Sequence, residues 1–127
     1  MTMPLILIAE DDFNIRSLLR LTLDTGNFEI IEAEDGVSAI EVARQRQPDL
    51  MFLDWRMPLR SGLEVCKALR ADPETAQIKI VMVTARAQEL DRQAALAAGV
   101  DDFITKPFSP IALLDKVREV LGADTLL

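Results

Sequence analysis

Six polar side chains of this sequence stand directly after short apolar runs, and their placement is more informative than their number. They are Glu10, Asp11, Asp12, Asp54, Thr84 and Lys106. In proteins with parallel sheets, ligands bind beyond the carboxyl ends of the strands, which share one edge. If the apolar runs are strands, these six side chains meet along that edge.

The chemistry of such a group can be worked out from the residue types. Clustered carboxylates repel one another unless they hold protons or recruit a cation, and oxygen-only ligands favour Mg²⁺. A carboxylate can also act as a nucleophile and form an acyl phosphate. Lys106 supplies a positive charge and Thr84 a hydroxyl donor, and both can stabilise a transferring phosphoryl group. The residues therefore predict metal-assisted phosphoryl transfer onto a carboxylate.

Each residue taken alone also has an ordinary structural explanation. Acids and threonine often cap helices, and Lys106 can simply neutralise Asp54. That explanation is much weaker for four strand ends that converge on one edge.

The elements that must position these residues alternate five times between apolar runs and amphipathic segments. The runs predict strands at 5–9, 28–31, 50–53, 78–83 and 102–105, and the helical spacing predicts helices at 14–25, 36–45, 63–70, 88–98 and 111–121. In the second helix, Val37, Ile40 and Val42 are expected to face inward. Ser109 is the expected N-cap of the last helix, with Pro110 at its first position. Five such units predict an α/β fold, a doubly wound parallel sheet with helices on both faces.

Length and composition set the limits for this fold. The 127 residues fit a single domain, 1–127, and half of them are apolar. The net charge is −7, so a direct nucleic-acid partner is not expected. The absence of histidine excludes His-based catalysis and a histidine phosphoacceptor. One cysteine, no apolar run long enough for a membrane span and no basic leader at the start favour the cytoplasm.

Four dispersed segments resemble the receiver domain of two-component response regulators over essentially the whole chain. They are LILIAEDD, LDWRMPLRSG around Asp54, VMVTA around Thr84 and GVDDFITKPF around Lys106, and their separations agree with the family pattern. The resemblance implies a flavodoxin-like, five-stranded parallel sheet of order 2-1-3-4-5 with five helices.

The resemblance also implies roles for individual residues. Asp54 is the implied phosphoacceptor, and Thr84 and Lys106 match the switch hydroxyl and the phosphate-binding lysine. Mg²⁺ is the implied cofactor. Its implied protein ligands are Glu10 acting through water, Asp11, Asp54 and the backbone carbonyl of Arg56, with Asp12 ranked below them. Phe103 matches the aromatic switch position, and the peptide bond before Pro107 is expected to be cis.

The implied partner is a histidine kinase or a histidine phosphotransfer protein. An unknown effector, or a second copy of the chain, is expected to bind the face made by the fourth helix, fifth strand and fifth helix. An aspartyl-phosphate phosphohydrolase is the alternative, although no second acid lies within two residues after Asp54. A flavodoxin-like cofactor carrier is a third possibility, but no Gly-rich loop follows the first strand.

Four further residues near these segments carry smaller expectations. Arg56 and Arg86 are expected to affect the lifetime of the phosphorylated state, with solvated surface arginines as the alternative. Trp55 is expected at the rim of the site, where its fluorescence should respond to Mg²⁺. Cys66 is expected to be a small core residue rather than a reactive thiol.

Overall fold

A central five-stranded parallel sheet organises the structure, a computed structural model that describes residues 3–85 and 89–122. The strands are β1 (Leu5–Ala9), β2 (Glu29–Ala33), β3 (Leu50–Asp54), β4 (Lys79–Thr84) and β5 (Asp102–Thr105). The strand order is β2-β1-β3-β4-β5, as the resemblance implies. All four neighbouring pairs are parallel, so the carboxyl ends of the strands lie at one edge.

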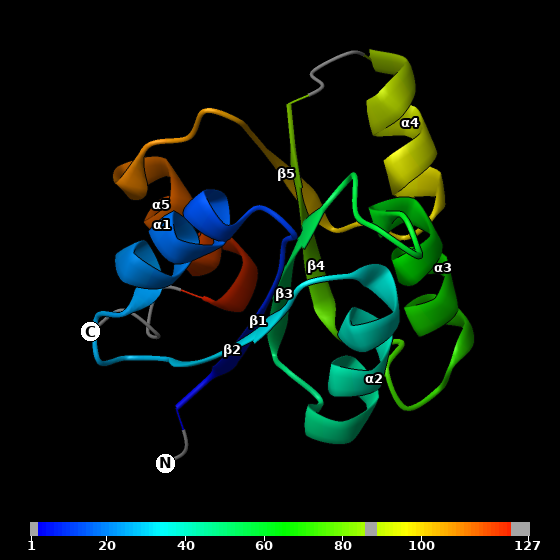
Figure 1. Cartoon of the computed structure of the whole chain (residues 1–127), viewed down its shortest axis with the longest axis horizontal. Helices are drawn as coiled ribbons and strands as arrows, with labels where there is room; N and C mark the ends of the chain where they lie inside the picture. Colours follow the sequence, from blue (N-terminus) through cyan, green and yellow to red (C-terminus); the bar gives the residue numbers. More distant parts are fainter. Residues whose placement is uncertain (1–2, 86–88, 123–127) are drawn as a thin grey trace.

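Five helices cover the two faces of this sheet. They are α1 (Phe13–Leu23), α2 (Gly36–Arg46), α3 (Gly62–Ala71), α4 (Glu89–Ala97) and α5 (Pro110–Leu121). Helices α1 and α5 lie on one face, while α2, α3 and α4 lie on the other (Figure 1). The doubly wound fold predicted from the alternation of elements is therefore confirmed.

The core follows from the alternation of side chains along the strands. In β3, Met51 and Leu53 join a buried cluster on the α2–α4 side, whereas Leu50 and Phe52 join the cluster beneath α1 and α5. Strand β3 is buried along its whole length because helices cover both of its faces. Asp54 is its last residue, so the most enclosed strand of the sheet carries the candidate nucleophile.

Side-chain caps explain where several helices begin. Ser109 caps α5 by accepting a hydrogen bond from the backbone N–H of Ala112 at 3.0 Å, with Pro110 at the first helical position, as predicted. In α3, Ser61 and Glu64 form a reciprocal capping box. Each cap gives an otherwise unpaired backbone N–H a partner at the helix start.

Two predictions about helices are wrong. Val37 is 40% exposed, because the buried face of α2 is formed by Ala39, Ile40 and Ala43 and only partly by Val42. The first helix was expected to extend to residue 25, but α1 ends at Leu23, with Asp24 at its C-cap. The expected start of the fourth helix at Gln88 lies outside the described residues.

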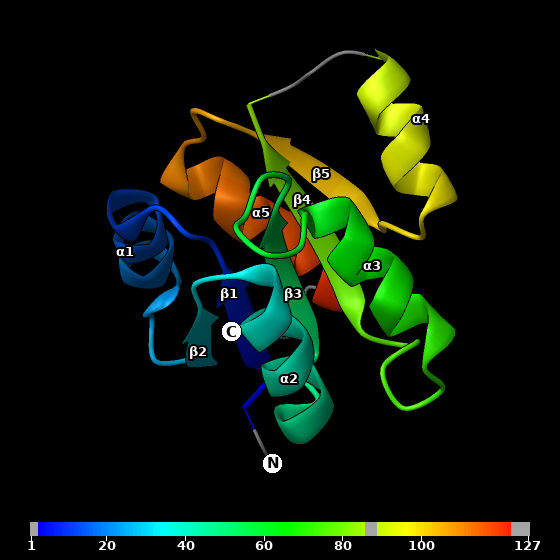
Figure 2. The same cartoon turned by 45° about the vertical axis from the view of Figure 1, so that its right-hand side comes forward.

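The loop between β3 and α3 is held against the rest of the fold by two glycines that leave no room for a side chain. A Cβ atom on Gly62 would lie 2.2 Å from the backbone oxygen of Asp54, and one on Gly36 would lie 2.2 Å from that of Arg60. The N–H of Gly62 donates to the carbonyl of Trp55, and that of Gly36 to Pro58. Figure 2 shows the loop reaching the start of α2. Both glycines allow the chain that follows Asp54 to pack closely.

Candidate functional site

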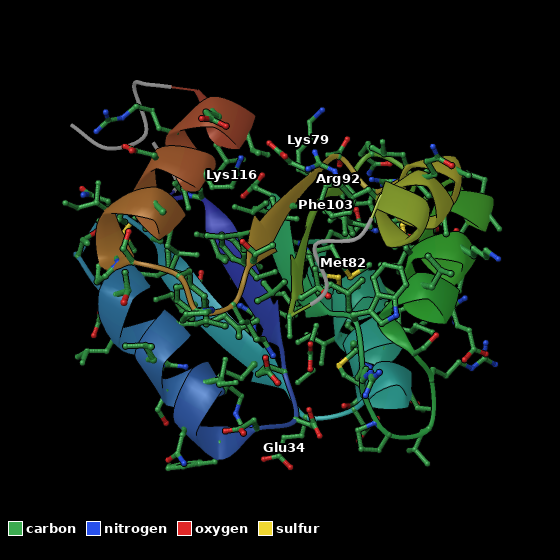
Figure 3. The ribbon with its side chains drawn as sticks, turned by 90° about the horizontal axis from the view of Figure 1, so that it is seen from above. Glu34, Lys79, Met82, Arg92, Phe103 and Lys116 are labelled. Atoms are coloured by element: carbon green, nitrogen blue, oxygen red, sulfur yellow. The ribbon has the colours of Figure 1, made fainter. Side chains whose placement is uncertain are left out.

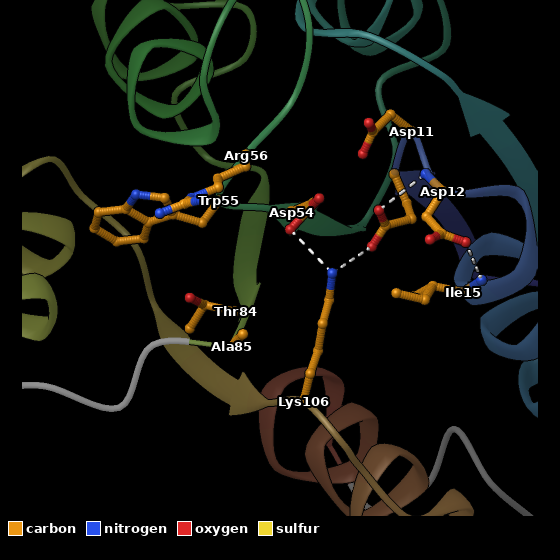
Figure 4. Close-up of a pocket in the computed structure, with 10 residues that line it drawn as sticks. Asp11, Asp12, Ile15, Asp54, Trp55, Arg56, Thr84, Ala85 and Lys106 are labelled. Atoms are coloured by element: carbon orange, nitrogen blue, oxygen red, sulfur yellow. Dashed lines mark hydrogen bonds and ion pairs between the residues drawn. The ribbon is translucent and has the colours of Figure 1, made fainter.

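A cleft of about 380 Å³ opens at the carboxyl edge of the sheet. Its lining residues come from the ends of β1, β3 and β4, the start of α1 and the segment after β5 (Figure 4). They are Glu10, Asp11, Asp12, Ile15, Asp54, Trp55, Arg56, Thr84, Ala85 and Lys106. All six polar residues singled out in the sequence thus line one cleft.

Three acids of the cleft form a group that fits a divalent cation. One carboxylate oxygen from each of Glu10, Asp11 and Asp54 lies within 4.8 Å of the others. Glu10 is 1% exposed and Asp54 6% exposed, whereas Asp11 is open to solvent. Among the described residues, Glu10 Oε1 is buried and accepts no hydrogen bond. An all-oxygen group with one side open to solvent suits Mg²⁺, which retains several waters.

Lys106 joins two of these acids. Its Nζ lies 3.0 Å from Glu10 Oε1 as an ion pair, and it donates a hydrogen bond to Asp54 Oδ1 at 3.2 Å (Figure 4). The ion pair gives Glu10 Oε1 an electrostatic partner although no hydrogen bond is formed. The ammonium group is therefore placed where it can neutralise negative charge beside Asp54.

Burial and neighbouring charges shift the pKa values of Glu10 and Lys106 in the cleft. Burial, together with the neighbouring Asp54 carboxylate, raises the pKa of Glu10 to about 7 even though Lys106 opposes the shift. Burial alone would lower the pKa of Lys106, but the close contact with Glu10 and the charges of Asp54 and Glu10 outweigh burial and raise that pKa. The cleft is lined by more acidic than basic side chains. A bound cation would reduce the repulsion between its carboxylates.

Asp12 has a capping role in the structure. Its Oδ1 accepts hydrogen bonds from the backbone N–H groups of Asn14 at 2.8 Å and Ile15 at 3.1 Å, which makes Asp12 the N-cap of α1. Its own N–H donates to Glu10 Oε2 at 3.2 Å. The ordinary structural explanation therefore accounts for Asp12, and this carboxylate is not part of the acidic group.

The remaining candidate residues take different places around the cleft. Thr84 is buried at the end of β4, and the exposed Arg56 lines the cleft two residues after Asp54. The peptide bond between Lys106 and Pro107 is cis, as the resemblance implies. Arg86 lies outside the described residues.

Phe103 lies outside the cleft, on the β5 surface that faces α4. Its ring is half buried and packs against the cluster on the α2–α4 side of the sheet. The guanidinium carbon of Arg92 lies 5.2 Å from the ring centroid, within cation–π range (Figure 3). Phe103 is therefore in place to repack if the neighbouring helix moves.

Cys66 is a core residue, as predicted. Its side chain is fully buried in α3, and its Sγ donates to the carbonyl of Ala98 at 3.3 Å. Burial raises the pKa of the thiol, which disfavours the reactive thiolate.

Three structural contributors to the site were missed in the sequence: Gly36, Gly62 and Arg16. Arg16 is 8% exposed and donates to the backbone carbonyl of Glu10 at 2.9 Å. Its spacing from Leu19 and Leu23, both on the buried face of α1, was a signal that could have found it.

Comparisons with known proteins agree with this fold and identify its family. The family model described as the response regulator receiver domain matches residues 6–118. The chain is 42% identical over 116 residues to the phosphate regulon transcriptional regulatory protein PhoB of Klebsiella pneumoniae, covering 91% of this chain and 51% of that protein. It is 38% identical over 116 residues to the alkaline phosphatase synthesis transcriptional regulatory protein PhoP of Bacillus subtilis, covering 91% and 48%. The chain thus spans about half the length of these curated relatives.

Solved structures show the same architecture. The chemotaxis protein CheY4 of Vibrio cholerae superposes with a TM-score of 0.89 at 29% identity, covering 94% of this chain and 99% of that one. The receiver domain of a sensor histidine kinase from Pseudomonas aeruginosa PAO1 superposes with a TM-score of 0.87 at 25% identity, covering 94% and 98%. The latter structure holds a magnesium ion coordinated in its active site cleft.

The fold and the family match define a signalling domain. The chain belongs to the response regulator receiver domain family of two-component systems. This assignment disfavours the phosphohydrolase alternative. In the part of the chain that the structure describes, none of the helices has the length and hydrophobicity needed to cross a bilayer.

Proposed function

We propose that Asp54 accepts a phosphoryl group from a histidine kinase or a histidine phosphotransfer protein. The observation that carries the proposal is the convergence of Asp54, two further acids and Lys106 in one cleft, with Lys106 Nζ 3.2 Å from Asp54 Oδ1. In the transfer, an Asp54 oxygen forms the new P–O bond as the P–N bond of the donor phosphohistidine breaks. The donor imidazole leaves with the electron pair of that bond.

Other residues of the cleft support this step. Glu10, Asp11, Asp54 and the backbone carbonyl of Arg56 would hold Mg²⁺, which supplies positive charge for the phosphoryl oxygens when it is bound. Lys106 neutralises charge from the side of β5, and the Thr84 hydroxyl would donate to a phosphoryl oxygen after moving toward it. The magnesium-holding receiver domain from Pseudomonas aeruginosa supports the choice of metal.

The output of the switch is the second part of the proposal. Movement of Thr84 toward the phosphoryl group would let Phe103 repack and change the face formed by α4, β5 and α5. A groove lined by residues of α4, β5 and α5, among them Arg92, Phe103 and Lys116, supports this surface as the place where an effector or a second copy binds (Figure 3). The names of the relatives assign transcriptional regulation to those longer proteins.

The cytoplasm is the compartment we propose. The chain has one cysteine and cannot form an internal disulfide, which suits a reducing compartment. Kinase-dependent phosphorylation also fits that location.

Loading with a small phosphodonor tests the proposed nucleophile. Wild-type protein incubated with Mg²⁺ and acetyl phosphate is expected to gain one phosphoryl group by intact mass, because the cleft supplies the nucleophile and its neutralising charges. Asp54→Ala should gain none, and chelation with EDTA should prevent loading of the wild type. Labelling of Asp54→Ala at the wild-type level would contradict the assignment.

Trp55 should report cation binding directly. It lines the cleft beside Asp54, so Mg²⁺ binding is expected to change its fluorescence in a saturable manner. The chain has one tryptophan, which makes the signal specific. Asp11→Asn should shift the titration to higher Mg²⁺ concentration because it removes a charged ligand. A fluorescence signal that does not respond to Mg²⁺ in a protein shown by another method to bind the ion would contradict this placement of Trp55.

A further inference from the structure

A nearly buried arginine joins α1 to the backbone of the acidic pair. Arg16 Nη1 donates to the carbonyl of Glu10 at 2.9 Å and makes a longer contact with that of Asp11 at 3.5 Å. The side chain is only 10% exposed, although it belongs to an otherwise amphipathic surface helix. The two acceptor carbonyls belong to the residues whose carboxylates face the cation site.

The same guanidinium group is anchored at the end of β2. Its Nε donates to Glu32 Oε1 at 2.9 Å, and its Nη2 donates to Glu34 Oε1 at 3.3 Å. The ring of Phe13 lies 5.6 Å from the guanidinium carbon. All three guanidinium nitrogens therefore donate hydrogen bonds. Their acceptors lie in β2, directly after β2 and directly after β1.

A guanidinium group held in this way restrains the chain between β1 and α1. The Glu10 peptide cannot rotate without breaking a hydrogen bond to a charged donor, and the longer 3.5 Å contact restrains the Asp11 peptide more loosely. Each carboxylate is attached to its own stretch of backbone. Restraining these peptides therefore restricts the positions that the two carboxylates can take in the cleft. Groups that orient metal ligands in this manner tune the affinity of the site.

We propose that Arg16 is a positioning residue for the divalent cation, acting through the backbone of Glu10 and Asp11. This inference rests on the proposed function, in which those acids hold Mg²⁺. It assigns to Arg16 a role in metal affinity in addition to its contribution to folding.

The sign of the effect separates positioning from simple electrostatics. Arg16→Met removes a positive charge next to a cation site, so charge alone predicts tighter cation binding. Loss of positioning predicts weaker binding. Arg20→Met is the matched control, because Arg20 pairs with the other oxygen of Glu32 but has no contact with the Glu10 or Asp11 carbonyl among the described residues.

The experiment measures Mn²⁺ binding to the purified chain by EPR, with Mn²⁺ standing in for Mg²⁺ at an oxygen-ligand site. The free aqua ion gives a strong signal that is lost on binding, so no phosphorylation is involved. Arg16→Met is expected to weaken Mn²⁺ binding about tenfold. Arg20→Met should bind as tightly as the wild type or slightly tighter. Circular dichroism and thermal unfolding establish that each variant is folded.

The outcomes distinguish the inference from the function on which it rests. If the wild type binds no Mn²⁺, the proposed metal site fails and the inference falls with it. If the wild type binds and Arg16→Met binds equally or more tightly, only the inference is overturned. If Arg16→Met does not fold, Arg16→Lys decides, because it keeps the charge but cannot reproduce the forked contacts. Weaker binding by Arg16→Lys supports positioning, and wild-type binding overturns it.

Discussion

Lys106→Met is expected to slow phosphorylation by acetyl phosphate about 100-fold at saturating Mg²⁺. Its ammonium group lies 3.0 Å from Glu10 Oε1 and 3.2 Å from Asp54 Oδ1, where negative charge must be neutralised as the phosphoryl group approaches. Methionine keeps most of the length and apolar character of the side chain, so the change isolates the charge. The measurement is the initial rate of phosphoryl incorporation, followed by intact mass.

Lys116→Met provides the control for loss of a lysine that forms ion pairs outside the cleft. Lys116 Nζ pairs with Asp102 at 3.0 Å and Glu119 at 3.2 Å and does not line the cleft. Its variant should load at the wild-type rate. Equal loading rates for Lys106→Met and the wild type would remove Lys106 from the phosphoryl-transfer step.

Gly62→Ala is expected to lower the free energy of unfolding by about 3 kcal/mol and to slow phosphorylation. A Cβ atom at this position would lie 2.2 Å from the backbone oxygen of Asp54. This collision cannot be relieved by a change of side-chain rotamer, because the oxygen belongs to the backbone. The strand end must therefore shift, and the Asp54 carboxylate shifts with it. Urea unfolding and the phosphodonor assay measure the two effects.

Gly26→Ala makes the same chemical change without a collision. No atom lies within 4 Å of a Cβ built at Gly26, and the cost is that of its positive φ of 87°, about 1–2 kcal/mol. This variant should be less destabilised than Gly62→Ala and should be phosphorylated at the wild-type rate. Gly62→Ala that is no less stable than Gly26→Ala would show that the strand end tolerates the displacement.

Much of the fold could be predicted from the sequence because buried parallel strands have a simple signature. Apolar runs such as 50–53 are enclosed on both faces, and the acids and the lysine that follow such runs reach the same edge. The strand order required the family resemblance, since the alternation of elements alone does not specify which strands are neighbours. Six of the polar residues that line the cleft were found from their place after the apolar runs.

The errors arose where a local pattern had two possible outcomes. Val37 is apolar, but small alanines fill the interface between α2 and the sheet, so the valine is left at the surface. Asp12 continues the acidic run but was ranked below Glu10 and Asp11 as a ligand, and it caps α1, one of the two roles considered for it. The residue types alone do not show which of three consecutive acids caps the helix that follows.

The residues that were missed contribute through tertiary contacts, and they do not belong to a recognisable sequence motif. Gly62 is informative only when Asp54 is known to lie against it, and Gly36 only when the 55–61 loop is known to cross its helix. Arg16 was detectable in principle, because it shares the buried face of α1 with two leucines. Its acceptors, the carbonyls of Glu10 and Asp11, could be identified only from the folded structure.

Chemical trapping of the phosphorylated residue tests the central claim most directly. An acyl phosphate on an aspartate is reduced by borohydride to an alcohol, which converts the residue to homoserine and allows its position to be read by peptide mass spectrometry. After loading with Mg²⁺ and acetyl phosphate, we predict homoserine at position 54 alone, and none when Mg²⁺ is withheld. Homoserine at another acid of the cleft, or a phosphoryl group on a serine or threonine with Asp54 unmodified, would contradict the assignment of Asp54 as the phosphoacceptor.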